Sequence, residues 1–208
     1  YQGQLINDML DVSKIIMGKF SVELVETEVE ANVSDVIAMV TPLATAKSIQ
    51  IKASFDSHLN PISADPIRLK QILWNLLVNA IKFSSPDQKI VISVKQHADQ
   101  IEIQIRDHGK GIAADFLPHI FARFAQAINH STRLHGGLGL GLAIAHSLVA
   151  MHNGTLKAES QGEGRGATFT VSFPILQNPT FKQKENSVKN TPNKIELRLD
   201  SVNLLIID

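Results

Sequence analysis

The sequence predicts an α+β protein, specifically a two-layer α/β sandwich in which helices cover one face of a mixed β-sheet. Two observations support this fold class. Some segments alternate strictly between apolar and polar residues, as in "IEIQI", which indicates strands with one buried face; others repeat apolar residues every three or four positions, which indicates amphipathic helices. Both kinds are interspersed between about residues 20 and 175, which favours one domain that packs helices against a sheet.

The chain begins with a predicted helix over residues 1–18. Leu5, Met9, Val12 and Ile16 lie four, three and four residues apart and form one helical stripe. A single amphipathic helix needs a partner for its apolar face. We therefore interpret this segment as part of a helical hairpin whose other helix lies outside the chain.

Residues 19–175 hold the elements of the sandwich. Alternation, helical periodicity and turn residues predict them in this order: a strand at 21–30, a helix at 33–47, a strand at 49–55, a helix at 66–83, a hairpin at 89–107, an irregular stretch at 112–136, a helix at 138–151, and strands at 154–160 and 167–173.

The last part of the chain differs in composition from the sandwich. Residues 176–196 are mostly polar and contain Pro179 and Pro192, which predicts a linker. Residues 197–208 end in the apolar run "SVNLLIID", which predicts that the first strand of a further domain begins here.

The overall composition excludes several classes of function. The 208 residues have a formal net charge of zero, which argues against bulk attraction to nucleic acid or to an anionic membrane. The absence of cysteine excludes a disulfide framework and a cysteine-based zinc site, and fits a cytoplasmic setting. No apolar run approaches the roughly 18 to 20 residues that a membrane span needs. We expect no nucleic-acid partner, no membrane segment in this chain, and a ligand that is recognised at local sites.

The helix predicted over 66–83 carries an unusual polar stripe. Asp65 is placed to cap its first amides and Pro66 suits its first position. On the face opposite the apolar residues, the spacing places these residues on one stripe: Arg68, Gln71, Asn75, Asn79 and Lys82. Such a stripe is often only a solvated face. Two central asparagines lower helix propensity, however, and an amide oxygen suits Mg²⁺ that also binds a polyphosphate, so we favour a functional stripe.

Two glycine-rich segments follow this helix. In the first, "DHGKGI", the strand alternation puts Asp107 on the apolar face, where a buried carboxylate needs hydrogen-bond donors such as an exocyclic amine of a bound base. Gly109 and Gly111 permit close approach of the backbone to a flat ligand. Taken alone, this segment is also compatible with a simple tight turn.

The second glycine-rich segment is "HGGLGLGL", which precedes a predicted apolar helix. Backbone amides and a helix N-terminus at this point can bind phosphate groups. It matches neither a P-loop nor the dinucleotide fingerprint. A flexible hinge is the alternative. The long irregular stretch between the two segments favours a lid over a nucleotide.

These segments occur in a recognisable order: "NLLVNAIKFS", "DHGKGI", "FARFAQ", "GGLGLGL" and "GRGATFTVSFP". Over residues 20 to 175 the chain resembles the ATP-binding catalytic domain of sensor histidine kinases, of the histidine kinase, gyrase and chaperone ATPase superfamily, whose Bergerat-type fold is an α/β sandwich. The segment 1–18 resembles the second helix of that family's dimerisation and phosphoacceptor hairpin. "VNLLIID" resembles the first strand of a receiver domain, with Asp208 at an acidic Mg²⁺-site position, so the resemblance implies a hybrid kinase.

The resemblance implies roles for several side chains toward ATP and Mg²⁺. Asn79 would bind the metal, Asn75 would lie beside the phosphates, and Lys82 would contact phosphate, which makes Asn75 and Lys82 the catalytic candidates. Asp107 would accept a hydrogen bond from the adenine amine. Thr168 would help to close the adenine side.

The glycine-rich segments would supply the rest of the nucleotide site. By resemblance, Gly109 and Gly111 line the base pocket and Arg133 is a further phosphate candidate. The phosphate cradle comprises Gly137, Leu138, Gly139, Leu140 and Gly141. Leu138 stands where the family often has Thr or Ser, which removes one hydroxyl contact but leaves the backbone amides.

The chain does not contain the family's phosphoacceptor. That residue is a histidine followed directly by Asp or Glu, and none of the eight histidines is followed by an acidic residue. We therefore expect ATP binding without self-phosphorylation. The implied partners are the protein's own phosphoacceptor hairpin and receiver domain, a downstream response regulator, and a second copy in a parent homodimer.

Two other functions use the same nucleotide fold. The related gyrase and chaperone ATPases place a glutamate four residues before the metal-binding asparagine to activate water, whereas this chain has Asn75 there, which cannot serve as a general base. Phosphoryl transfer to protein is therefore favoured over hydrolysis. A nucleotide-sensing scaffold without chemistry is the second alternative.

Overall fold

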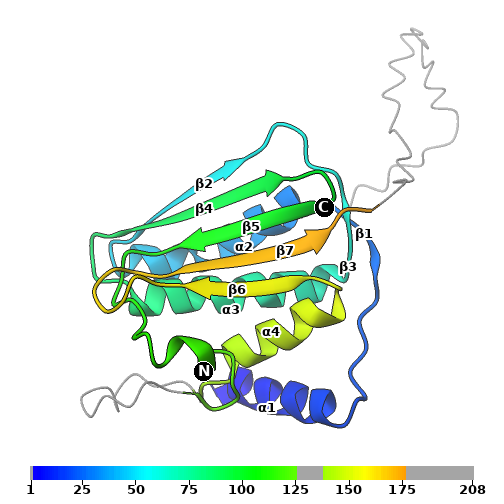
Figure 1. Ribbon diagram of the computed structural model, residues 1–208, viewed down its shortest axis with the longest axis horizontal. Helices are drawn as coiled ribbons and strands as arrows, with labels where there is room; N and C mark the ends of the chain where they lie inside the picture. Colours follow the sequence, from blue (N-terminus) through cyan, green and yellow to red (C-terminus); the bar gives the residue numbers. More distant parts are fainter. Residues whose placement is uncertain (1, 126–137, 177–208) are drawn as a thin grey trace, which may run out of the picture.

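The computed structural model describes residues 2–125 and 138–176. A five-stranded sheet forms one layer and three helices cover one of its faces, so the predicted two-layer sandwich is confirmed (Figure 1). The elements are, in order, α1 (Gln2–Ile16), β1 (Val25–Thr27), α2 (Val29–Thr45), β2 (Gln50–Phe55), β3 (Ile62–Ala64), α3 (Pro66–Phe83), β4 (Lys89–Gln96), β5 (Gln100–Arg106), the 3₁₀ turn η1 (Leu117–His119), α4 (Gly141–Met151), β6 (Thr155–Glu159) and β7 (Thr168–Pro174).

The sheet is mixed, with strand order β2-β4-β5-β7-β6. Strands β2 and β4 are parallel, and the other neighbours are antiparallel. Strands β1 and β3 form a separate antiparallel pair. Alternation along β5 buries Ile101, Ile103 and Ile105 between the sheet and the helices, and leaves Glu102 and Gln104 on the outer face. Each such buried side chain contributes about 1.5–3 kcal/mol through removal of apolar surface from water.

Helix α3 has the predicted bounds because both of its ends carry strong local signals. Its Asp65 cap accepts hydrogen bonds through Oδ1 from the N–H groups of Ile67 (3.0 Å) and Arg68 (3.2 Å), and Pro66 occupies the first turn. The helix ends at Ser84, which has an extended backbone. Leu69, Leu73, Leu76 and other residues of the apolar side are fully buried, and they face the isoleucines of the sheet.

A buried histidine joins the start of α3 to the end of α4. The side chain of His152 is 1% exposed. Its Nδ1 lies 2.6 Å from the carbonyl oxygen of Leu148, to which it must donate, so Nε2 is the acceptor for the N–H of Asp65 at 3.1 Å. The imidazole is therefore a neutral structural group, as expected for a packing histidine.

Several elements differ from the sequence predictions in their bounds, and one was not predicted. The strand predicted at 21–30 is reduced to β1, because the helical period of Val29, Val33 and Val36 starts four residues earlier than predicted and buries those side chains in α2. The short strand β3 was not predicted. Helix α4 begins at Gly141 rather than at residue 138.

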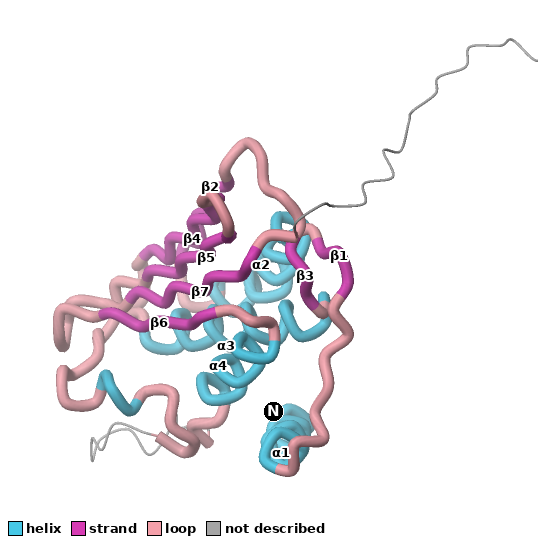
Figure 2. Tube along the Cα trace, turned by 45° about the vertical axis from the view of Figure 1, so that its right-hand side comes forward, coloured by secondary structure: helices cyan, strands magenta, loops and turns pink. Residues whose placement is uncertain are grey.

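Helix α1 lies beside α4, away from the sheet (Figure 2). Of its predicted apolar stripe, Val12 is buried, whereas Met9 and Ile16 are more than half exposed; the side chain of Leu5 lies outside the described side chains. Asp11 joins α1 to the start of α3. Its Oδ2 accepts a hydrogen bond from Gln71 Nε2 at 2.8 Å and lies 3.5 Å from Arg68 NH1.

The linker and further strand predicted for residues 176–208 lie outside the described residues apart from Leu176. Within residues 2–125 and 138–176, no helix combines the length and apolarity needed to cross a membrane.

Candidate functional site

The polar stripe on α3 divides into two parts with different surroundings. Arg68 and Gln71 contact Asp11 of α1, as described above. Asn75, Asn79 and Lys82, which follow on the next turns, are half-buried and lie toward the C-terminal half of the helix. The stripe is thus not a uniformly solvated face, because its first half holds another helix.

Asn75 connects α3 to the start of α4. Its Nδ2 donates a hydrogen bond to the carbonyl oxygen of Gly141 at 3.1 Å, and because that partner is an acceptor, the orientation of the amide is fixed. A Cβ atom at Gly141 would lie 3.5 Å from the amide of Asn75, in ordinary contact. The second glycine-rich segment and the asparagine helix therefore meet at this bond.

Asn79 differs from Asn75 because its side chain has no hydrogen-bond partner among the described residues. Its half-buried amide forms no hydrogen bond with any residue in 2–125 or 138–176. An unused amide oxygen one turn beyond Asn75 fits a neutral ligand for a hard cation. Within the same residues, no three His, Asp or Glu side chains gather into a group that could hold a metal by themselves.

The C-terminal end of α3 is closed by a lysine from a distant part of the chain. Lys47 Nζ donates hydrogen bonds to the carbonyl oxygens of Ile81 (2.9 Å), Lys82 (2.8 Å) and Ser84 (2.7 Å). The remaining carbonyl of Phe83 accepts from the N–H of Lys110 at 3.1 Å. These bonds satisfy the carbonyl groups that a helix end leaves open, and the positive charge complements the helix dipole.

Lys82 lies on this fixed last turn. Burial lowers the pKa of its ammonium group, and the positive charge of Lys110 lowers that pKa further. The Nζ atom is 5.0 Å from the centre of the Phe83 ring. A cation that is partly desolvated and close to another cation gains free energy when an anion binds between or beside the two.

Asp107 ends β5 and is 5% exposed, as the alternation predicted. Its Oδ1 accepts hydrogen bonds from the N–H groups of Gly109 (2.8 Å) and Ala167 (3.3 Å). Burial raises the pKa of the carboxyl group above its ordinary 3.8, while these backbone donors and His108 act in the opposite direction. Oδ2 accepts no hydrogen bond from the described residues, so a ligand amine can supply the missing donor.

The glycines after Asp107 are required by close backbone packing. A Cβ atom at Gly109 would collide with the carbonyl oxygen of Phe83, at the end of α3. Gly111 has φ +68°, and a Cβ there would collide with the carbonyl oxygen of Gly162. The loop after β5 is thereby held between α3 and the β6–β7 connection, next to Asp107.

This geometry matches a known family of nucleotide-binding domains. Residues 64–177, more than half of the chain, match the family model for "Histidine kinase-, DNA gyrase B-, and HSP90-like ATPase". The chain belongs to this ATPase family. The resemblance drawn from the sequence motifs is therefore confirmed.

Relatives of this ATPase domain are histidine kinases. The chain is 36% identical over 207 residues to hybrid signal transduction histidine kinase D of Dictyostelium discoideum, which covers 85% of this chain and 13% of that protein. It is 35% identical over 183 residues to signal transduction histidine-protein kinase BarA of Escherichia coli K12, covering 85% of this chain and 20% of that protein. The chain thus spans a fifth or less of these two relatives.

Solved structures agree with the fold. Full-length ShkA, crystallised in complex with AMPPNP, matches with a TM-score of 0.73 and 29% identity over 84% of this chain and 36% of that chain. The catalytic domain of histidine kinase ThkA matches with a TM-score of 0.65 and 23% identity over 74% of this chain and 98% of that chain, which supports the fold alone.

The structure brings most, but not all, of the predicted residues of this ATPase domain together. Leu138 is exposed and Leu140 is buried against the core, and Gly139 accepts a hydrogen bond from the N–H of Phe124 at 3.2 Å. Arg133 and Gly137 lie outside the described residues.

Thr168 lines a hollow of ≈ 420 Å³ together with Asp107 and Ala167. It pairs with Arg106 and Glu159 in the sheet, and because Phe169 points into the core, the side chain of Thr168 points to the outer face. The N–H of the neighbouring Ala167 donates a hydrogen bond to Asp107. Ala167 was not among the site residues predicted from the sequence. The alternation of β7 was sufficient to separate the two positions, because Ala167 has the same phase as Phe169.

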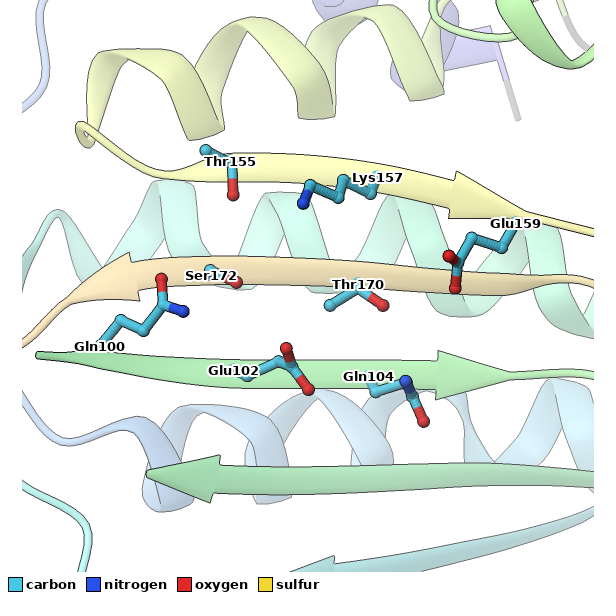
Figure 3. Close-up of a pocket in the computed structure, with 8 residues that line it drawn as sticks. All are labelled: Gln100, Glu102, Gln104, Thr155, Lys157, Glu159, Thr170 and Ser172. Carbon is cyan, nitrogen blue, oxygen red and sulfur yellow. The ribbon is translucent and has the colours of Figure 1, made fainter. Parts of the chain in front are cut away.

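The outer face of the sheet carries a separate polar hollow of ≈ 470 Å³ (Figure 3). Its lining side chains come from β5, β7 and β6, and include Glu102, Gln104, Lys157 and Thr170. None of the predicted nucleotide-binding residues lines it. It lies on the sheet face opposite the helices, so it does not compete with the group around Asp107 as the candidate site.

Proposed function

We propose that this chain is the ATP-binding catalytic part of a two-component sensor histidine kinase, which transfers the γ-phosphoryl group of Mg-ATP to a histidine on a helical hairpin outside the chain. The proposal depends most on one observation: the amide of Asn75 donates a hydrogen bond to the carbonyl oxygen of Gly141. The residue at this position orients the phosphate end of the site, yet an amide cannot remove a proton from water. The relatives named as histidine kinases support the same reaction.

We assign the base end of the site to Asp107, Gly109 and Gly111. Oδ2 of Asp107, which has no donor in the described part of the chain, accepts a hydrogen bond from the adenine amine. The two glycines leave room for the base against the backbone. Oδ2 of Asp107 has no donor among the described residues and is not fully buried, so an adenine amine can reach it, which supports this assignment.

We assign the phosphate end to Asn79, Lys82, Gly139 and Gly141, with Arg133 and Gly137 as further candidates. Asn79 holds Mg²⁺ through its amide oxygen, and the ion neutralises charge on the phosphates when bound. Lys82 offsets negative charge that develops on the γ-phosphoryl group during transfer. The amide of Asn79, which has no hydrogen-bond partner in residues 2–125 and 138–176, and the lowered pKa of Lys82 support these roles.

In the proposed reaction, an imidazole nitrogen of the phosphoacceptor attacks the γ-phosphorus, an N–P bond forms, and the bond to the bridging oxygen breaks to release ADP. The chain's own contribution is to hold the triphosphate in line and to leave water unactivated. Hydrolysis of the gyrase or chaperone type and a scaffold without chemistry are the alternatives.

The parent protein is proposed to be a hybrid kinase and a homodimer. Its own receiver domain and a downstream response regulator are the proposed acceptors of the phosphoryl group. The proposed location of this catalytic part is the cytoplasm, in a parent that is either cytoplasmic or anchored in the inner membrane. The hybrid kinase among the relatives supports this organisation, although the described residues end before the predicted receiver strand.

The reaction is tested by mixing the chain with a separate phosphoacceptor hairpin, Mg²⁺ and γ-labelled ATP. We expect label on the histidine of the hairpin, and no label when Asn79→Ala replaces the native chain. Release of labelled phosphate without labelled protein identifies an ATPase. Nucleotide binding without either product identifies a scaffold, and both of these results contradict the proposal.

A further inference from the structure

Three lysines lie at the C-terminal end of α3: Lys47, Lys82 and Lys110. Within residues 2–125 and 138–176, none of them forms an ion pair with a carboxylate; the ion pairs there involve Arg68, Lys70 and His97. Three cations without a carboxylate partner form a local excess of positive charge on a chain with a net charge of zero. Such a cluster is expected to attract an anion.

The three ammonium groups have different partners. Lys47 uses its hydrogen-bonding capacity on the carbonyl oxygens at the end of α3. Lys82 and Lys110 instead lie against the same aromatic ring, with Nζ atoms 5.0 Å and 5.6 Å from the centre of Phe83. Two cations at one ring repel each other. Burial and, to a smaller extent, the charge of Lys110 lower the pKa of both Lys82 and Lys47.

The backbone of Lys110 is fixed although its side chain is exposed. Its N–H donates to the carbonyl of Phe83 at 3.1 Å, and its carbonyl accepts from the N–H of Gly164 at 2.5 Å. Gly109 and Gly111 on either side are held by the close contacts described above. The side chain therefore starts from a rigid position beside Lys82 and can turn toward a ligand at little cost in backbone order.

We propose that Lys110 is a further phosphate-binding residue of this site, acting with Lys82 on the polyphosphate of the nucleotide; the inference rests on the proposed function. A bound phosphate removes the repulsion between the two lysines. Phosphate is favoured over a neutral group because two cations meet there without a carboxylate partner in the described residues. The sequence did not predict this role, because Lys110 lies between two glycines and there resembles the variable position of a turn.

The test is calorimetric titration of Lys110→Met with ATP, ADP and adenosine. Lys157→Met, on the outer face of β6, is the matched control, since it also removes one exposed lysine. We expect ATP to bind Lys110→Met about fivefold to twentyfold more weakly than wild type, as for loss of one exposed charge-assisted contact. Adenosine should bind both variants within about twofold of wild type, and Lys110→Arg should restore most of the ATP affinity.

A salt series adds a second readout. If Lys110 binds phosphate, the ATP affinity of Lys110→Met should depend less steeply on ionic strength than that of wild type and of Lys157→Met. Unchanged ATP affinity overturns the inference, as does an equal loss for ATP and adenosine, which would mean that Lys110 only packs on Phe83. If the wild-type chain binds neither ATP nor adenosine, the proposed function itself fails, and this result is distinct from a defect confined to the variant.

Discussion

The two ends of helix α3 use the same kinds of polar residue in opposite ways. At the N-terminal end, Asp65, Gln71 and His152 all find partners within the protein. At the C-terminal end, the amide of Asn79 and the Oδ2 of Asp107 have none in the described residues, and Lys82 lies close to another cation. Satisfied polar groups hold the fold together, whereas unsatisfied ones mark where a ligand binds.

The largest effect on stability is expected at the N-terminal end. His152→Ala leaves the N–H of Asp65 without its acceptor and removes the edge contact between the imidazole and Phe173, whose ring centres are 5.9 Å apart. We expect the free energy of unfolding to fall by about 3 kcal/mol, measured by urea denaturation. His146→Ala is the control, because its exposed ring stacks on Phe121 and forms no hydrogen bond with residues 2–125 or 138–176, and it should cost less than about 1 kcal/mol. Similar losses for the two variants would contradict the structural role of His152.

At the C-terminal end of α3, where the site lies, substitutions should change ligand affinity more than stability. Asp107→Asn keeps an acceptor for Gly109 and Ala167 but removes the charge, so adenosine affinity should fall about 10- to 100-fold as a charge-assisted hydrogen bond is lost.

The difference in stability between wild type and Asp107→Asn is predicted to depend on pH. Since burial raises the folded-state pKa of Asp107 above 3.8, the folded wild type holds its proton more tightly than the unfolded chain. Its stability therefore falls as the pH rises from 3.8 through the folded-state pKa, whereas Asp107→Asn does not show this loss. The variant should be the more stable protein at pH 7 and equal to wild type below pH 3.8. A variant that is less stable at pH 7 would show that the backbone donors outweigh burial.

A substitution of Lys47 tests whether the stability of the C-terminal end of α3 can be separated from ligand binding. Lys47→Met removes the partner of three carbonyl groups, so we expect a loss of about 1–2 kcal/mol in the free energy of unfolding. Because Lys82 lies on the same turn, ATP affinity should also fall by about threefold to tenfold. Lys52→Met, an exposed lysine of β2, is the control and should change neither quantity. Loss of stability with unchanged ATP affinity would separate the helix end from the site.

The smallest effect is expected where α1 meets α3. Asp11→Asn removes the charge opposite Arg68 but keeps an oxygen for Gln71, so the free energy of unfolding should fall by less than about 1 kcal/mol. Differential scanning calorimetry at low and high salt measures the change, which should vanish at high salt. A larger, salt-independent loss would show that α1 depends on this contact.

Local signals explain what the sequence revealed of this fold. Asp65 with Pro66 and the alternation before Asp107 determine structure over a few residues, so α3 and the buried carboxylate were predictable. The start of α2 was missed because Val29 continues the alternating pattern of Val25 and Thr27 in β1. Lys47 was not predictable in its role, because its three partners are more than 30 residues away in the chain.

Register and charge explain what the sequence left hidden in the site. The alternation of β7 gives the phase of Ala167, but its contact with Asp107 also depends on the register between β5 and β7, which no short segment encodes. The closeness of Lys110 to Lys82 likewise depends on the packing of a loop against the end of a helix. Contacts of this kind arise only from the tertiary fold.

The division of α3 is tested most directly by comparing Asn79→Ala with Gln71→Ala in Mg-ATP binding and in urea denaturation. Asn79→Ala should lose more than about tenfold in Mg-dependent ATP affinity while its stability stays equal or rises by about 0.5 kcal/mol, because alanine favours helix. Gln71→Ala should keep its ATP affinity and lose only its contacts with Asp11 and Arg68. Unchanged Mg-ATP affinity in Asn79→Ala, or an equal loss in Gln71→Ala, would contradict the assignment of the C-terminal half of α3 to the ligand.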